Sequence, residues 1–97
     1  MTDMPPHILN SLYQLIADRR ANPPPGSYTA TLFAAGTNEI VKKLAEEAVE
    51  VALAAKDADH GHTVYEIGDL LYHLTVLMVD QGISYDEVWV ELARRHK

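Results

Sequence analysis

The sequence predicts an all-α fold: a bundle of four to five helices, formed by one domain over residues 1–97 and completed by oligomerisation. Apolar residues recur at helical spacing along most of the chain, and no segment shows the sustained alternation of a β-strand. Clusters of Pro and Gly separate the helical segments and favour short connections. A chain of 97 residues can build one core, but its surface-to-volume ratio is poor, so association would stabilise it.

The first helix is predicted from about Pro5 to Arg20, with Asp3 as its N-cap, because prolines are tolerated in the first helical turn. The run Asn-Pro-Pro-Pro-Gly at residues 22–26 is the strongest break in the chain. A short helix is expected to follow Ser27 and to stop at Gly36, since Gly is the usual residue just beyond a helix end.

The two longest helices are predicted at about residues 38–57, with Thr37 as N-cap, and at about residues 63–81. The apolar stripe of the first covers an arc of roughly 80° on a helical wheel. Thr63 and Glu66 are expected to form a capping box at the start of the second. This second helix carries two apolar stripes. Because a helix that is apolar nearly all round is a buried helix, we expect a partner subunit to cover one stripe.

A fifth helix is predicted after Gly82, with a capping box formed by Ser84 and Glu87. Its apolar side chains, Val88, Trp89 and Leu92, are expected to face the core.

The net charge of the chain is −6, which argues against a protein that coats nucleic acid. The chain has no Cys, and its first residues lack the pattern of a signal peptide. No apolar stretch approaches the roughly 20 residues that span a membrane. We therefore expect a cytoplasmic protein that does not act on membranes.

Five acidic residues form two groups on the two longest helices: Glu46, Glu47 and Glu50, then Glu66 and Asp69. Glu47 with Glu50, and Glu66 with Asp69, are spaced i, i+3, so each pair lies on one helix face. Two such helices packed antiparallel would bring four carboxylates together, with Glu46 more peripheral. Clustered carboxylates repel one another and are costly to desolvate, so a divalent cation would stabilise them. Oxygen ligation favours Mg²⁺, Mn²⁺ or Ca²⁺, and Mg²⁺ is the expected cofactor.

Acidic runs on helices are often only solvated faces, and Glu66 has a capping role that needs no metal. Asp69 favours the metal site most, because it sits mid-helix between two apolar stripes, where its helix propensity is poor. His73 is interpreted as a structural residue. His60 and His62 form a His-x-His pair with no third ligand nearby, so we do not assign them to a metal.

Candidate phosphate-binding residues flank the acidic groups. Lys43 lies on the carboxylate side of its helix, where it would pair with Glu47 or reach a phosphate. Ser27 and the residues after it would donate hydrogen bonds to phosphate or ribose, or would only cap the short helix. The candidate set is Ser27, Tyr28, Thr29, Lys42 and Lys43.

The acidic pattern Glu-Glu-x-x-Glu followed by Glu-x-x-Asp resembles the signature of the all-α nucleoside-triphosphate pyrophosphohydrolases, the MazG-like superfamily. A closer resemblance, from about Leu12 to Arg95, is to the phosphoribosyl-ATP pyrophosphatase family of histidine biosynthesis. It is carried by Ser27-Tyr28-Thr29, Leu32-Phe33, Gly36, Ile40, Lys42-Lys43 and Asp69-Leu70-Leu71-Tyr72-His73-Leu74. The chain departs from this family at Glu39, where a basic residue is usual, and at Ala45, where Gly is common.

The resemblance implies Mg²⁺-dependent hydrolysis of phosphoribosyl-ATP to phosphoribosyl-AMP and pyrophosphate, the second step of histidine biosynthesis. It implies catalytic roles for Glu47, Glu50, Glu66 and Asp69, metal binding by these four with Glu46 assisting, and phosphate binding by Lys42 or Lys43 and by residues 27–29. It also implies a homo-oligomer, dimer or tetramer, with sites at or near subunit interfaces.

Two alternatives stay open at this point. The same chemistry would serve a house-cleaning enzyme that acts on dUTP or other non-canonical nucleoside triphosphates. A non-catalytic helical dimerisation module, with its acidic residues forming a solvated face, is the second alternative. The segments 27–29 and 42–43 favour phosphoribosyl-ATP over the first alternative.

Overall fold

The computed structural model describes residues 8–96, which form five α-helices and contain no β-strand. The helices are α1 (Ile8–Ala21), α2 (Tyr28–Ala35), α3 (Thr37–Lys56), α4 (His60–Gln81) and α5 (Tyr85–Arg95). The all-α prediction is therefore confirmed for this part of the chain, and no helix in it is long and apolar enough to cross a membrane. The predicted cap at Asp3 and helix start at Pro5 lie outside the described residues.

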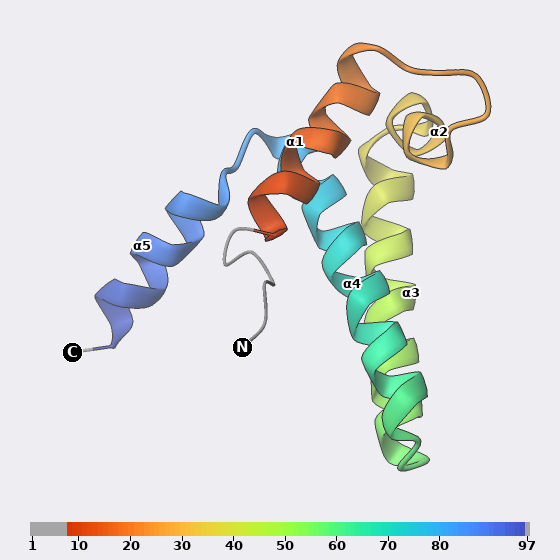
Figure 1. Ribbon diagram of the computed structural model, residues 1–97, viewed down its shortest axis with the longest axis vertical. Coiled ribbons are helices and arrows are strands. Elements are labelled where there is room, and N and C mark those ends of the chain that lie inside the picture. Colours follow the sequence, from red (N-terminus) through yellow and green to blue (C-terminus); the bar gives the residue numbers. More distant parts are fainter. Residues whose placement is uncertain (1–7, 97) are drawn as a thin grey trace.

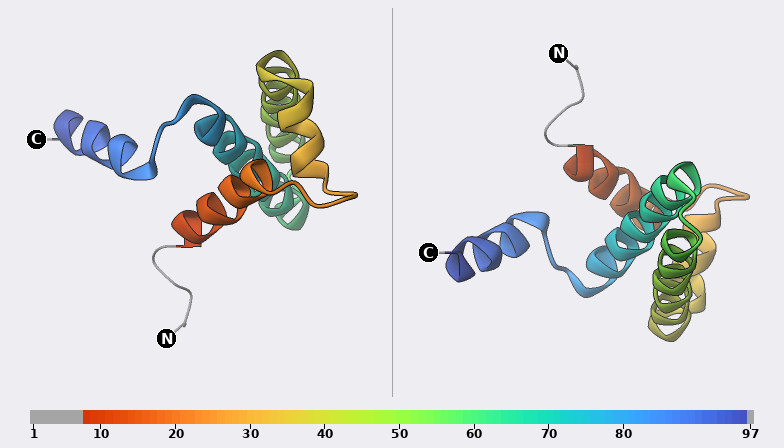
Figure 2. Two further views of the ribbon diagram at one scale, coloured as in Figure 1. Left: turned by 90° about the horizontal axis from the view of Figure 1, so that it is seen from above. Right: turned by 90° about the horizontal axis from the view of Figure 1, so that it is seen from below.

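The antiparallel pair α3 and α4 forms the body of the fold (Figure 1). Helices α1 and α2 pack near the start of α3 and the end of α4, while the other end of the pair, around the turn between them, extends beyond them. Helix α5 projects away from this body, as the two views of Figure 2 also show. The two longest helices therefore share one long seam that α1 and α2 cover only at one end.

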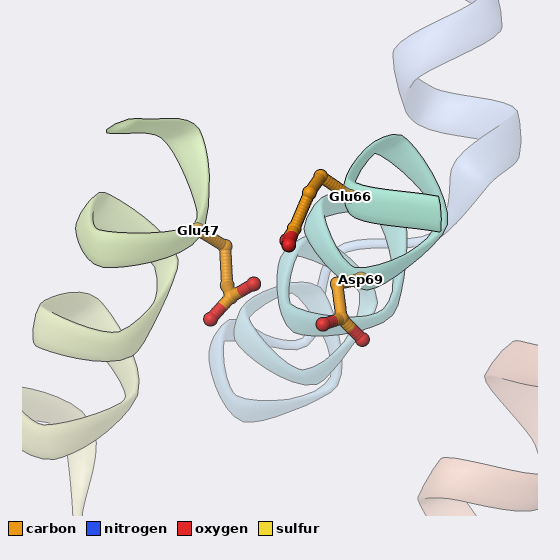
Figure 3. Close-up of side chains that lie close together, drawn as sticks. All are labelled: Glu47, Glu66 and Asp69. Atoms are coloured by element: carbon orange, nitrogen blue, oxygen red, sulfur yellow. The ribbon is translucent and has the colours of Figure 1, made fainter. Parts of the chain in front are cut away.

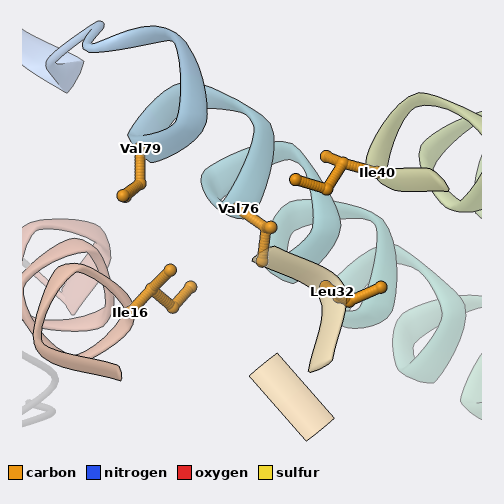
Figure 4. Close-up of a cluster of buried hydrophobic side chains, with 5 residues drawn as sticks. All are labelled: Ile16, Leu32, Ile40, Val76 and Val79. Atoms are coloured by element: carbon orange, nitrogen blue, oxygen red, sulfur yellow. The ribbon is translucent and has the colours of Figure 1, made fainter. Parts of the chain in front are cut away.

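The core lies where the first four helices meet (Figure 4). Its buried side chains are Ile16 of α1, Leu32 of α2, Ile40 of α3, and Val76 and Val79 of α4. Burying one such side chain fully contributes roughly 1.5–3 kcal/mol to stability. Arg20 fastens α1 to this core, because it donates a hydrogen bond to the Val79 carbonyl over 3.0 Å and lies over the Phe33 ring.

The start of α3 differs from the prediction by one residue. Gly36, with a φ of 101°, is the N-cap, and Thr37 is the first helical residue. The Thr37 hydroxyl instead donates a hydrogen bond to the Asp80 carboxylate over 2.8 Å. This bond joins the first turn of α3 to the last turn of α4, a contact between residues 43 positions apart in the sequence.

The predicted start of α4 at Thr63 is wrong, and so is the capping box of Thr63 with Glu66. Helix α4 begins at His60, because Asp59 is the N-cap and its carboxylate accepts a hydrogen bond from the His62 N–H over 3.0 Å. The Thr63 hydroxyl donates to the Asp59 carbonyl over 2.7 Å. An acidic N-cap upstream thus lengthens the helix, and Glu66 is free of any capping role.

Helix α5 confirms its predicted capping box, in which Ser84 and Glu87 bond reciprocally. The prediction that Trp89 and Leu92 face the core is wrong within this chain: they are 43% and 41% exposed. Tyr85 is the buried residue of this helix, and its ring stacks on Trp89 with centroids 5.3 Å apart. The amphipathic period is present, but α5 projects outward, so its apolar face meets little of this chain.

Candidate active site

Three carboxylates meet in the seam between α3 and α4 (Figure 3). Glu47 comes from α3, and Glu66 and Asp69 come from α4. Each offers one oxygen, and these three oxygens lie within 4.8 Å of one another. The spacing of Glu66 and Asp69 by three residues places them one turn apart on the same helix face, opposite Glu47.

The three side chains lie in the seam where α3 packs against α4. Glu66 is only 8% exposed, and Glu47 and Asp69 are half-buried. On the wheel of α3, Glu47 borders the stripe that contains the buried Ile40. Acidic groups on a solvated face would be exposed, so this burial argues against that interpretation for the three carboxylates.

The electrostatics of the cluster act on Glu47 above all. Burial raises the pKa of the Glu47 carboxyl above its ordinary value, and the Asp69 and Glu66 carboxylates raise that pKa further. The nearby His73 lowers it in part. The cluster is therefore short of positive charge, as expected where like-charged groups share one site.

His62 is a hydrogen-bond partner of the Glu66 carboxylate. Its Nε2 lies 2.9 Å from Glu66 Oε2, and Nε2–H donates this hydrogen bond to the carboxylate. The two residues are four apart on α4, which brings their side chains together. The structure thus gives His62 a contact with the cluster that its sequence position as half of a His-x-His pair did not reveal. The i, i+4 spacing to Glu66 was the available signal.

Glu46 and Glu50, the remaining predicted acidic residues, lie outside this group and are exposed. Glu46 forms an ion pair with Lys43, with Nζ 3.4 Å from the carboxylate oxygen, and the pair raises the pKa of Lys43. Lys43 therefore does not pair with Glu47, the partner that i, i+4 spacing suggested. Metal roles for Glu46 and Glu50 stay predictions.

The candidate phosphate-binding turn at the start of α2 is anchored to α4. Ser27 is the N-cap of α2, and its hydroxyl oxygen accepts a hydrogen bond from the Ala30 N–H over 3.1 Å. The Thr29 hydroxyl bonds to the Tyr72 hydroxyl. The Tyr28 hydroxyl lies 3.4 Å from Nε2 of His73. Of the two candidate lysines, Lys43 is half-buried and Lys42 is exposed.

Tyr72 and His73 are neighbours of the site that the sequence did not assign to it. His73 is 6% exposed, and its Nδ1–H donates to the carbonyl of Asp69 over 2.9 Å. Burial raises the pKa of the Tyr72 hydroxyl above its ordinary value. Both residues contact α2 across more than 40 positions of sequence, and no local spacing encodes such a contact.

The donor set fits a hard divalent cation. The group contains carboxylate oxygens only, which suits Mg²⁺, Mn²⁺ or Ca²⁺ better than a structural zinc. Oxygens bound to one Mg²⁺ lie at most about 4.2 Å apart, because each metal–oxygen distance is about 2.1 Å. Small rotations of the three side chains would reach this spacing. The raised pKa of Glu47 is a second sign that a positive charge would stabilise the cluster.

Comparison with known proteins gives consistent matches. Residues 9–96 match the family described as Phosphoribosyl-ATP pyrophosphohydrolase. A Limosilactobacillus fermentum protein named phosphoribosyl-ATP pyrophosphatase is 52% identical over 87 residues, which cover 90% of this chain and 82% of that protein. A Lactiplantibacillus plantarum protein of the same name is 47% identical over 87 residues, with the same coverage of 90% and 82%.

A longer relative matches equally well. The histidine biosynthesis bifunctional protein HisIE of Caldanaerobacter subterraneus subsp. tengcongensis is 48% identical over 90 residues. The match covers 93% of this chain but 44% of that protein, so the chain spans less than half of the bifunctional relative.

The raised pKa of Glu47 predicts how the metal-free protein responds to pH. Above the ordinary glutamate pKa of 4.5, the unfolded chain loses this proton while the folded chain keeps it. The folded state then binds more protons, so raising the pH through this window lowers its stability. We expect Glu47→Gln to raise the melting temperature in EDTA, by an amount that grows as pH rises from the acid end of this window to neutrality.

Glu50→Gln is the matched control, because Glu50 is an exposed acid of the same helix. Its melting-temperature difference from wild type should stay flat with pH. If the Glu47→Gln difference is equally flat, Glu47 does not carry the repulsion assigned to it.

Proposed function

Because this chain belongs to the phosphoribosyl-ATP pyrophosphohydrolase family, we propose that it hydrolyses phosphoribosyl-ATP between the α and β phosphates. The products are phosphoribosyl-AMP and pyrophosphate, and the reaction is the second step of histidine biosynthesis. Relatives that share about half of their residues with this chain carry this activity in their names. The reaction requires no membrane, and we place it in the cytoplasm.

The observation that carries the proposal is the carboxylate cluster of Glu47, Glu66 and Asp69 beside an anchored polar turn. A site that binds a nucleotide polyphosphate needs both a cation, which neutralises the phosphate charge, and hydrogen-bond donors, which hold the phosphate oxygens. Residues 27–29 and Lys43 would donate hydrogen bonds to phosphate and sugar oxygens. This turn and the cluster meet on α4, through the contact of Tyr28 with His73.

We propose Mg²⁺ as the cofactor, held by Glu47, Glu66 and Asp69, with Glu50 and Glu46 assisting. When bound, it would neutralise phosphate charge and lower the pKa of a water molecule for attack on phosphorus. One of the carboxylates would accept the proton of that water. His62 holds Glu66 by one oxygen, which leaves the other free for the cluster.

A homo-oligomer is the proposed working form. An apolar groove of 380 Å³ runs between α1, α4 and α5, with Leu71, Leu74, Leu77 and Trp89 among its lining residues. Towards the turn between α3 and α4, Leu53 and Val64 are more than half exposed. Exposed apolar surfaces of this kind often mark protein–protein contacts, and a second copy of the chain would bury them.

The substrate and the metal are tested together by pyrophosphate release. Phosphoribosyl-ATP, dUTP and ATP are compared with and without Mg²⁺. We expect phosphoribosyl-ATP to be hydrolysed fastest, and only with Mg²⁺. Equal or faster turnover of dUTP would favour the house-cleaning alternative instead.

The same assay on Asp69→Asn separates an enzyme from a dimerisation module. Loss of a metal ligand should lower activity by about 100-fold or more, since even outer partners of a metal site are worth about 10- to 100-fold. The metal-free fold should stay intact or become slightly more stable, because one repelling charge is removed. Asp57→Asn, an exposed acid at the end of α3, is the control and should keep full activity. Full Mg²⁺-dependent activity in Asp69→Asn would contradict the assignment of Asp69.

The oligomer is tested at the apolar groove. Leu74→Asp places a charge among its lining residues and should convert the assembly to monomers, measured by light scattering after size exclusion. Val90→Asp is the control, because Val90 is 69% exposed and does not line the groove. Circular dichroism verifies that both variants remain helical. A Leu74→Asp protein that is helical and keeps the wild-type mass would show that this groove is not the interface.

A further inference from the structure

We propose that Tyr28 and His73 form a positioning pair that holds the substrate-binding turn of α2 in register with the helix that carries Asp69. The inference rests on the proposed function and adds to it a residue on α4 that would act on the substrate through Tyr28. Tyr28 would touch the substrate, and His73 would fix where Tyr28 stands.

His73 is bonded at both ring nitrogens. Nδ1 lies 2.9 Å from the Asp69 carbonyl oxygen, which can only accept, so Nδ1 carries a proton and donates. In the neutral ring Nε2 is then an acceptor, and the Tyr28 hydroxyl, 3.4 Å away, is its donor. The ring is 6% exposed. One buried imidazole therefore connects the backbone of a cluster residue to the hydroxyl of a residue 45 positions earlier.

Aromatic packing fixes the direction of the Tyr28 ring. It stacks on Tyr72 with centroids 6.5 Å apart and planes at 27°, and it meets His73 edge-on at 6.1 Å. Tyr72 in turn packs edge-on against His73 at 4.9 Å and bonds the hydroxyl of Thr29. Two successive residues of the α2 turn are thus hydrogen-bonded to two successive residues of α4.

Tyr28 combines this anchoring with exposure. Its relative exposure is 50%, so the anchored residue still presents half of its surface to solvent. A tyrosine that served only the core would be buried, as Tyr85 is at 4%. A Tyr28 that is fixed in this way would meet the substrate without first being ordered, so it would lower KM more than it raises kcat.

Tyr28→Phe tests the pair, since it removes the hydroxyl and keeps the stacked ring. A lost hydrogen bond of ordinary strength corresponds to about a three- to tenfold change. We expect KM for phosphoribosyl-ATP to rise by this factor, with kcat changed less than about twofold and the half-saturating Mg²⁺ concentration unchanged. Tyr13→Phe is the matched control: Tyr13 lies on α1, packs against Tyr85, and should keep the wild-type KM.

A double-mutant cycle shows whether Tyr28 acts through His73. In a His73→Leu background, Tyr28→Phe should change KM by less than about twofold, because the acceptor is already lost. His73→Gln, which keeps an acceptor near the position of Nε2, should recover part of the loss. If His73→Leu does not fold, the comparison of Tyr28→Phe with Tyr13→Phe decides alone.

An unchanged KM in Tyr28→Phe, or effects that add fully in the double variant, would overturn the pair even if melting temperatures fall. Wild-type hydrolysis of phosphoribosyl-ATP separates this outcome from failure of the proposed function. If wild type releases no pyrophosphate from phosphoribosyl-ATP, the proposed function fails and the pair fails with it.

Discussion

Mutual repulsion among the carboxylates of Glu47, Glu66 and Asp69 is the constraint around which the rest of the structure is arranged. Their oxygens lie within 4.8 Å of one another in the seam between α3 and α4, where Glu66 is buried and Glu47 and Asp69 are half-buried. Burial and the neighbouring charges raise the pKa of Glu47, so the folded chain holds these groups at a cost in stability. The packing of α3 against α4 must outweigh that cost. A cation bound in the seam would attract all three carboxylates, so its binding would stabilise the folded chain.

The remaining elements follow from this seam. Helices α1 and α2 bury Ile16 and Leu32 against it and close one end, while Thr37 and Asp80 tie the two long helices together there. The first turn of α2 contacts α4 one helical turn beyond Asp69, where the Tyr28 hydroxyl bonds to His73. The substrate-binding candidates and the cluster are therefore positioned by the same helix. The apolar groove beside α5 lies on a surface that this arrangement leaves uncovered.

Sequence reasoning succeeded where the physics is local. Helical periodicity predicted the all-α fold, and the i, i+3 spacing predicted that Glu66 and Asp69 would share a helix face. The helical wheel predicted Glu47 and Glu50 as the inward-facing pair of their helix, with Glu46 more peripheral. Of that pair, Glu47 lies in the carboxylate group between α3 and α4, whereas Glu50 is exposed in the described chain and its metal role stays a prediction. On the wheel Glu50 lies about 60° further from the apolar stripe than Glu47, so the packing of α3 against α4 encloses only Glu47. The capping box at Thr63 failed because Asp59, another good cap, stands four residues earlier. The contact of Tyr28 with His73 spans 45 positions and depends on how α2 packs, which no local pattern specifies.

The central claim is that Glu47, Glu66 and Asp69 together bind one divalent cation, and anomalous diffraction from crystals grown with Mn²⁺ tests it directly. Mn²⁺ takes the place of Mg²⁺ in oxygen sites and is located by its scattering without reference to activity. We expect an anomalous peak between α3 and α4, about 2.0–2.3 Å from one oxygen of each of the three carboxylates. A Mn²⁺ peak elsewhere on the protein, with none between these three side chains, would contradict it.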